Sequence, residues 1–250
     1  MQKRDTHILT VIGCGDAFSS GGNAQTCFHV ESPGGTFLID CGTGVLASLK
    51  KHNLAVGDID TIIISHFHGD HYGGLPYLLL EAAREKRKER LTIVSPPGGR
   101  EKTQQLMELL YPGSSVLDGL NLLFVPYEQE VEITLPYLTV TPIPVPHKPE
   151  TQPHGVRIRT AQKTIGYSGD TGWTDQLVKI ATDADLFICE CCFYETKVNG
   201  HLNYLQLSEH IARFRFNTKQ ILLTHFDEEM LANMDKVQLP HAYDGLRLIV

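Results

Sequence analysis

The segment His66-Phe67-His68-Gly69-Asp70-His71 constrains the fold of this chain more than any other part of it. Three imidazoles and a carboxylate lie within six residues, directly after Thr61–Ser65, a β-branched run that predicts a buried strand. Imidazole and carboxylate groups are ligands of Zn²⁺ and related ions. One ion cannot easily use all four side chains, because neighbours such as Asp70 and His71 diverge, whereas two adjacent ions can. The segment therefore predicts a metal centre at a strand end.

A centre of two ions needs more ligands than this segment supplies. His147, Asp170 and His225 each follow a run of residues that favour a strand. Open α/β sheets place their binding sites at the carboxyl ends of strands. Each of these three residues taken alone is as consistent with an ordinary loop as with a ligand. Taken together with the first segment, they are predicted to complete the metal centre.

The order of predicted elements places the chain in the α/β class. Strands and helices alternate in both halves, as in the strand Leu91–Ser95 followed by the helix Glu101–Leu110. A hairpin turn around Ser32–Gly35 indicates mixed sheets instead of all-parallel ones. We find no linker, repeat or low-complexity tract. A chain of 250 residues can bury about 70–75% of its unfolded surface, so residues 1–250 are expected to form a single domain.

The charge balance bears on the partners of the protein. There are 22 Lys and Arg residues against 29 Asp and Glu residues, which gives a formal net charge of −7. Proteins that clamp nucleic acid over a broad surface are usually basic, so nucleic acid is possible as a partner but not favoured. An acidic protein can still present a positive pocket where bound ions supply the charge. A small anionic substrate is therefore expected.

Neither a membrane segment nor a leader is indicated by the sequence. No apolar run approaches the ~18 residues that a membrane span needs. The apolar stretch Ile8–Ile12 is too short for the hydrophobic region of a signal peptide. Six cysteines without a signal peptide indicate reduced thiols. These features favour a cytoplasmic protein with no membrane partner.

In their order along the chain, the predicted ligands resemble those of the metallo-β-lactamase superfamily. The resemblance covers nearly the whole length, including the loop Gly13–Gly15 and the strand end Leu38–Gly42. It implies an αββα four-layer sandwich, in which two mixed β-sheets are flanked by helices and the site lies at one edge. The residues that carry it are His66, His68, Asp70, His71, His147, Asp170 and His225.

The same resemblance implies how two metal ions would be bound. Asp40 would orient the metal-binding segment from behind the ligands. The expected ions are two Zn²⁺, with Mn²⁺ or Fe as alternatives, because His and Asp sites bind all three. Two ions about 3.5–4 Å apart would hold a bridging hydroxide that attacks the substrate. One ion would be held by His66, His68 and His147, the second by Asp70, His71 and His225, and Asp170 would bridge them.

Glu190 and His201 resemble the catalytic pair of the tRNase Z branch of this superfamily. By that match His201 would protonate the leaving group and Glu190 would orient it. Asp70 is expected to be essential for catalysis as well as a ligand. The residues that flank the pair differ from the usual sequence of this branch. An alternative therefore remains, in which His201 is an ordinary loop residue and Glu190 a carboxylate at a strand end, neither with a catalytic role.

One departure from the tRNase Z pattern bears on the substrate. A typical tRNase Z inserts a long flexible arm that grips tRNA between the third histidine ligand and the bridging aspartate. Here the corresponding residues, His147 and Asp170, are 23 positions apart, which leaves no room for an arm. The leading expectation is therefore a phosphodiesterase acting on a smaller phosphodiester.

Two alternatives remain open at this stage. A lactonase or another carbonyl-ester hydrolase would use the same metals, and a tRNA 3′-processing endoribonuclease is a second alternative. A redox diiron protein is disfavoured, because His68 stands where those members use glutamate. A homodimer is suggested by the resemblance alone. The substrate itself and the roles of His154, Cys189, Cys191 and Cys192 are not determined by the sequence.

Overall fold

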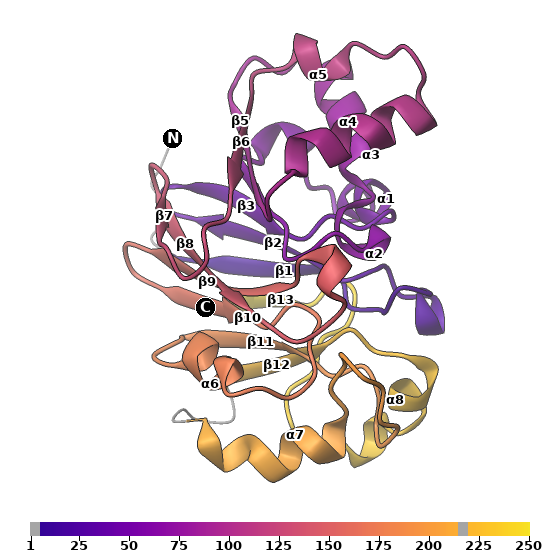
Figure 1. Ribbon diagram of the computed structural model, residues 1–250, viewed down its shortest axis with the longest axis vertical. Helices are drawn as coiled ribbons and strands as arrows, with labels where there is room; N and C mark the ends of the chain where they lie inside the picture. Colours follow the sequence, from indigo (N-terminus) through magenta and orange to yellow (C-terminus); the bar gives the residue numbers. More distant parts are fainter. Residues whose placement is uncertain (1–5, 215–219) are drawn as a thin grey trace.

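Two mixed β-sheets pack against each other in the computed structural model, which describes residues 6–214 and 220–250 (Figure 1). The first sheet has the strand order β13-β1-β2-β3-β4-β5-β6. Its strands from β13 to β3 pair antiparallel, and those from β3 to β6 pair parallel. The strands are β1 (Ile8–Gly13), β2 (Cys27–Ser32), β3 (Gly35–Ile39), β4 (Thr61–Ile63), β5 (Leu91–Ser95), β6 (Leu122–Pro126) and β13 (Arg247–Ile249).

The second sheet is also mixed. Its order is β12-β11-β10-β9-β8-β7, with parallel pairing among β10, β11 and β12 and antiparallel pairing from β7 to β10. Its strands are β7 (Ile133–Thr134), β8 (Leu138–Pro144), β9 (His154–Thr160), β10 (Thr164–Tyr167), β11 (Leu186–Glu190) and β12 (Ile221–Thr224).

Helices lie on the outer sides of both sheets, as Figure 1 shows. Helix α3 packs with Leu75, Leu78, Leu79 and Ala82 buried, the spacing of one apolar helical face. Within the described residues, none of the helices is both long and apolar enough to cross a membrane. The helices are α1 (Val45–Lys51), α2 (Gly69–Tyr72), α3 (Leu75–Arg84), α4 (Gly99–Leu110), α5 (Val116–Gly119), α6 (Gln176–Ala181), α7 (Tyr204–His210) and α8 (Glu228–Ala232).

The alternation of side chains along each strand produces two apolar layers. On β3, Phe37 and Ile39 enter the core between the sheets, whereas Leu38 points to the helices on the outer side. On β2, Phe28 likewise faces the core between the sheets and Cys27 the helical layer. The mixed α/β architecture agrees with the sequence prediction, because apolar residues on both faces of a strand require cover on both sides.

Strands β3, β4, β10, β11 and β12 all end at the same side of the molecule, the right-hand side of Figure 1. Two residues that directly follow these strands, Asp40 and His225, adopt left-handed backbone conformations with φ of 60° and 66°. Such conformations are uncommon for residues other than glycine and concentrate at functional sites. They turn the chain sharply at the strand end, which brings both side chains back towards the gap between the sheets.

Candidate metal centre and active site

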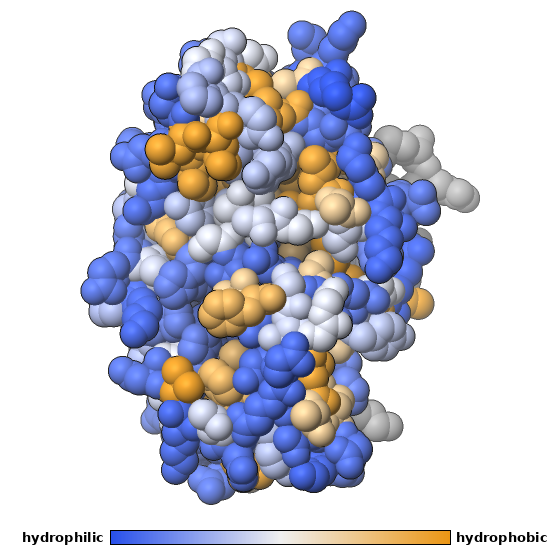
Figure 2. All heavy atoms as spheres, turned by 90° about the vertical axis from the view of Figure 1, so that its right-hand side faces the viewer, coloured by the Kyte–Doolittle hydropathy of each residue, from blue (hydrophilic) through white to orange (hydrophobic). Residues whose placement is uncertain are grey.

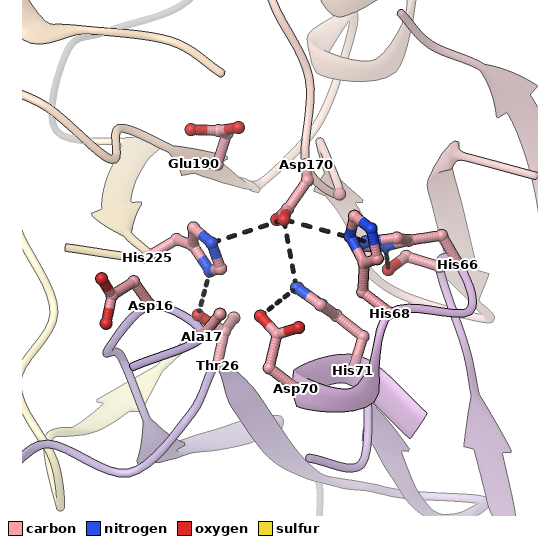
Figure 3. Close-up of polar contacts among 12 residues, drawn as sticks. Asp16, Ala17, Thr26, His66, His68, Asp70, His71, Asp170, Glu190 and His225 are labelled. Atoms are coloured by element: carbon pink, nitrogen blue, oxygen red, sulfur yellow. Dashed lines mark hydrogen bonds and ion pairs between the residues drawn. The ribbon is translucent and has the colours of Figure 1, made fainter. Parts of the chain in front are cut away.

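The structure brings the seven predicted ligands together at this edge, in two groups that share Asp170. Figure 3 labels all of them except His147. In the first group, Nδ1 of His68 lies 3.1 Å from Nε2 of His66 and 3.0 Å from Nε2 of His147. Oδ2 of Asp170 lies 3.7 Å and 3.9 Å from the same two Nε2 atoms. The candidate ligand atoms of the group all lie within 4.8 Å of one another.

The second group consists of Asp70, His71, His225 and, again, Asp170. Nε2 of His71 lies 3.1 Å from Oδ2 of Asp70 and 3.3 Å from Oδ2 of Asp170. Nε2 of His225 is also 3.3 Å from that Asp170 oxygen. Asp170 therefore stands between the two groups, as Figure 3 shows, in the place that a bridging carboxylate requires.

Hydrogen bonds on the outer nitrogens orient the imidazoles. Nδ1 of His147 donates to the carbonyl oxygen of Gly200 at 2.7 Å, and Nδ1 of His71 donates to Oδ2 of Asp40 at 2.7 Å. Because a carbonyl or carboxylate oxygen can only accept, Nδ1 of each ring carries a proton, and Nε2 is the nitrogen that faces the centre and can bind a cation once it holds no proton. Nδ1 of His225 pairs with the hydroxyl of Thr26 at 3.1 Å.

Two buried polar atoms at the centre make no hydrogen bond, although one of them lies close to two carboxylates. Within the part of the chain that the structure describes, Nε2 of His71 and Oδ1 of Asp170 are buried without a hydrogen bond. Leaving such groups unpaired is costly, so native proteins rarely do so. Converging imidazole nitrogens and carboxylate oxygens are the donor set of Zn²⁺ and similar ions. The residues present therefore fit two divalent cations.

Neighbouring charges shift the pKa values of the buried groups in the centre. Burial opposes the ionisation of Asp170, but the charges of His225 and His71 outweigh it and hold the pKa of this carboxyl well below its usual range. Burial also opposes a charge on His71, yet Asp170 and Asp70 raise its pKa well above the usual value. A cation that binds Nε2 of His71 must therefore displace a proton, which couples metal binding to proton release.

Asp40 supports the centre from behind. Its Oδ2 accepts hydrogen bonds from Nδ1 of His71 at 2.7 Å, from the hydroxyl of Tyr167 at 2.8 Å and from the hydroxyl of Ser65 at 2.9 Å. Its Oδ1 accepts from the backbone N–H of Ser65 at 2.7 Å. Tyr167 belongs to β10 in the second sheet, so this buried carboxylate also connects the two sheets. The arrangement matches the orienting role expected for Asp40.

Glu190 and His201 form a pair beside the metal centre. Nδ1 of His201 donates to Oε1 of Glu190 at 2.9 Å, and the backbone N–H groups of Thr171, Cys192 and Leu202 also donate to this fully buried carboxylate. Burial opposes a charge on His201, but the charge and hydrogen bond of Glu190 outweigh it and raise its pKa to about 9. His201 therefore holds a proton at neutral pH.

A pocket of about 650 Å³ opens over these residues. Figure 2 views this side of the molecule, where hydrophilic surface is interrupted by patches of apolar side chains. His68, Asp70, Asp170, His201 and His225 line the pocket, so members of both ligand groups and His201 face one space. Its volume suits a small molecule.

Several other residues of the pocket wall are not predicted from the sequence. They include the aromatic residues Phe18 and Phe193 and the acidic residues Asp16, Asp227 and Glu228. Phe18 is 89% exposed, an unusual position for phenylalanine. A signal for Phe18 was present, since an isolated apolar residue in a polar loop beside Gly13–Gly15 has no core to enter.

The structure places the four residues whose roles the sequence does not determine, one histidine and three cysteines. His154 is buried, and its Nδ1 lies 2.8 Å from the carbonyl oxygen of Gln152; it is not among the pocket-lining residues. Cys189 and Cys191 are fully buried in the core between the sheets. Cys192, in contrast, lines the pocket.

Comparisons with known proteins place the chain among metal-dependent hydrolases. A family model described as anti-Pycsar protein Apyc1 matches residues 7–240. The chain is 27% identical over 226 residues to the probable metallo-hydrolase YhfI of Bacillus subtilis, covering 87% of this chain and 86% of YhfI. It is also 27% identical over 268 residues to ribonuclease Z of Ignicoccus hospitalis, covering 87% of each chain.

Solved structures show the same fold. The crystal structure of YhfI, described as a metallo-β-lactamase fold protein, superposes with a TM-score of 0.77 at 23% identity, covering 99% of this chain and 100% of YhfI. The short form of human tRNase Z gives a TM-score of 0.77 at 24% identity, covering 96% and 98%. The predicted four-layer sandwich and a metal-dependent hydrolase are confirmed, and the similarity to ribonuclease Z supports the predicted tRNase Z-like branch.

Proposed function

The chain belongs to the family of the anti-Pycsar protein Apyc1 and is a metal-dependent hydrolase, and we propose that it cleaves a small phosphodiester with one negative charge. The observation that carries the proposal is the shared position of Asp170. It joins two groups of ligands in a pocket that also contains His201. Such an arrangement suits a reaction in which one phosphate is held by two cations and its leaving oxygen needs a proton.

Seven side chains would hold the cations. Two Zn²⁺ ions, or Mn²⁺ or Fe, would supply a nucleophilic water and neutralise the charge that develops on the substrate. The chain fixes the ligands in advance, because Gly200 and Asp40 hold the outer nitrogens of His147 and His71. His66, His68 and His147 would bind the first ion, Asp70, His71 and His225 the second, and Asp170 both.

His201 would supply the proton to the leaving oxygen. Its Nδ1 is held by Glu190, so the proton on Nε2 is the one available to a substrate. A catalytic acid must carry its proton at the working pH, and Glu190 ensures this by raising the pKa of His201. Glu190 is therefore a positioning residue, since it acts through His201.

The charges of the pocket favour a substrate with a single phosphate. Among the described residues that line it there is neither Lys nor Arg, while Asp16, Asp227 and Glu228 are acidic. Bound cations would attract one phosphate, but further phosphates would meet carboxylates without a compensating cation. Strands β8 and β9 are joined by residues 145–153, which leaves no tRNA-gripping arm there. Both features favour a small substrate over precursor tRNA.

Two aromatic residues favour a flat substituent on that substrate. Phe18 and Phe193 line the pocket, and the loop of Phe18 is held by Asp16, whose Oδ1 accepts from the backbone N–H groups of Phe18 at 3.1 Å and Ser20 at 3.0 Å. An exposed phenylalanine on a fixed loop offers a stacking surface. A nucleoside cyclic monophosphate, with one charge and a flat base, is therefore a suitable probe.

Hydrolysis assays on metal-loaded protein test the proposal. We expect turnover of bis(p-nitrophenyl) phosphate and of nucleoside cyclic monophosphates, with little activity on precursor tRNA or on lactones. Asp70→Ala should abolish activity, and His201→Ala should reduce kcat by about 10²–10⁴-fold. His241→Ala, which alters a histidine outside this pocket, is the matched control. Activity on lactones alone, or an unchanged rate in His201→Ala, would overturn the phosphodiesterase assignment or the role of His201, respectively.

A further inference from the structure

Among the described residues that line the pocket, Cys192 is the one cysteine, and no step of the proposed reaction uses it. It is only 5% exposed, and it follows β11 after the buried Cys191. Its Sγ and one ring nitrogen from each of His201 and His225 lie within 4.8 Å of one another. These three side chains form a third cluster of metal-ligand type, next to the two groups that share Asp170.

The hydrogen bonds of the site show which of these atoms are available. Nε2 of His225 already faces Asp170 at 3.3 Å, so His225 belongs to the second metal group. Nδ1 of His201 is bonded to Glu190, which leaves its Nε2 for the pocket. The backbone N–H of Cys192 donates to the same Glu190 carboxylate at 3.2 Å. Glu190 therefore fixes Cys192 and His201 relative to each other.

The chemistry of this pair differs from that of the main centre. None of the seven ligands proposed for the two-metal centre contains sulfur, whereas a thiolate with an imidazole is a donor set that Zn²⁺ and softer cations prefer. We propose that Cys192 and His201 form a separate, inhibitory binding site for a thiophilic divalent cation such as excess Zn²⁺ or Cd²⁺. Solvent and nearby pocket groups would complete its coordination.

The surroundings of Cys192 determine what can react with it. Burial raises the pKa of its thiol, and the carboxylates of Glu190, Asp170 and Asp227 raise it further. The thiol is therefore protonated and a poor nucleophile when no cation is present. The same carboxylates favour the approach of a cation, which provides the driving force to release the proton.

Inhibition follows from the proton balance at His201. As the cation binds, the thiol of Cys192 releases its proton to solvent, and His201 releases the proton of Nε2, so that sulfur and nitrogen each offer a lone pair. His201 then has no proton for the leaving oxygen, and the cation occupies pocket space. This consequence rests on the catalytic role proposed above for His201, but binding of the cation does not.

Titration with Cd²⁺ of protein already loaded with two equivalents of Zn²⁺ tests the site directly. We expect one further equivalent to bind and to produce the ultraviolet charge-transfer band of a cadmium thiolate. Cys192→Ala should lose the band, and the matched control Cys189→Ala, which removes a core thiol, should keep it. His201→Ala should weaken binding of the additional Cd²⁺ by about 10–100-fold.

Inhibition is measured on the same samples with bis(p-nitrophenyl) phosphate. Wild-type protein should lose activity over the Cd²⁺ range in which the band appears, and Cys192→Ala should need more than about tenfold more Cd²⁺. A band that persists in Cys192→Ala overturns the site, and equal inhibition of both proteins overturns its inhibitory role. If no phosphodiester is cleaved, the proposed function fails, while the band still decides whether the site exists.

Discussion

At the scale of single residues, Asp40 shows how a buried carboxylate organises the centre without facing the pocket. Three side-chain donors, from His71, Tyr167 and Ser65, converge on its Oδ2. Its left-handed φ of 60° is a strained conformation that the surrounding hydrogen bonds hold in place. A buried carboxylate that accepts from Nδ1 of His71 favours the Nδ1–H tautomer of this ring, and it would thereby orient a ligand of the proposed second cation.

Substitution of Asp40 should weaken metal binding. In Asp40→Asn, the amide lacks the charge, and its NH₂ group cannot accept the proton of His71, so metal affinity should fall by about 10–100-fold. Metal content after dialysis against buffered Zn²⁺ measures the effect. Asp60→Asn is the matched control, because Asp60 accepts from the backbone N–H of Thr36 in β3, the strand that precedes Asp40, but lies outside the centre. Equal metal content in both variants contradicts the orienting role.

His201 makes the stability of the metal-free protein depend on pH. Its pKa is about 9 in the folded protein against 6.5 for an unperturbed imidazole, so its ion pair with Glu190 stabilises the fold fully below pH 6.5 and is lost as pH rises through 9. The free energy of unfolding of wild type minus that of His201→Gln should therefore be about 2–3 kcal/mol larger at pH 6 than at pH 9.5. Denaturant titrations of both metal-free proteins measure this difference in stability. A difference that is the same at pH 6 and pH 9.5 contradicts the ion pair between His201 and Glu190.

At the scale of elements, the sequence predicts which segments are strands and helices better than where they end. The run predicted as a strand over Thr61–Ser65 is found as β4, which ends at Ile63 because the next residues turn towards the centre. The helix predicted over Glu101–Leu110 is found as α4, which begins two residues earlier, at Gly99, and ends at the predicted residue. Gly98 turns the chain before this helix with a φ of 88°.

Some residues of the candidate site can be predicted from the sequence and others cannot. Ligands at strand ends are predictable, because the carboxyl ends of strands meet at one edge and imidazoles there have no packing role. Phe193 and Asp227 are not, and the sequence signal for Phe18 shows only that it has no place in the core, because all three residues reach the pocket through loop conformations that depend on contacts distant in sequence. One such contact is the hydrogen bond from the backbone N–H of Gly21 to Glu228 in α8. Side-chain contacts between the two sheets cannot be predicted from local sequence patterns either.

An ion pair between α1 and α3 gives a test at this scale. Glu81 of α3 pairs with Arg84 and with Lys50 of α1, and these hydrogen bonds lower the pKa of Glu81 to about 2. The pairs stabilise the fold above pH 4.5 and lose this effect as the pH falls towards 2. The side chains of Lys50 and Arg84 are mostly exposed. Glu81→Gln should therefore lower the free energy of unfolding by only about 0.3–1 kcal/mol at pH 7 and by less at pH 3. Urea unfolding at both pH values measures it, and a larger loss at pH 3 contradicts the ion pairing.

At the scale of the whole molecule, the centre lies where the two sheets meet. Asp40 and His71 follow strands of the first sheet, whereas Asp170 and His225 follow strands of the second. Cations bound between these residues would connect the two sheets, in addition to binding the substrate. The acidic net charge of −7 is compatible with an anionic substrate for the same reason, since bound cations would supply the local positive charge.

Metal removal should therefore lower the stability of the whole protein. A cation present at 100 times its Kd adds about 2.7 kcal/mol to the folded state, which corresponds to about 5–10 °C in Tm for a chain of this size. Thermal unfolding with and without a chelator measures the shift. Asp170→Asn, which alters the residue shared by both groups, should abolish most of it. A Tm that does not respond to chelation contradicts metal binding between the sheets.

Anomalous diffraction from crystals of Zn²⁺-loaded protein locates bound cations and the residues that hold them. We expect two peaks about 3.5–4 Å apart. The first should contact His66, His68 and His147, the second Asp70, His71 and His225, and Asp170 should contact both. A single peak, or two peaks that do not share Asp170, would contradict a two-metal centre.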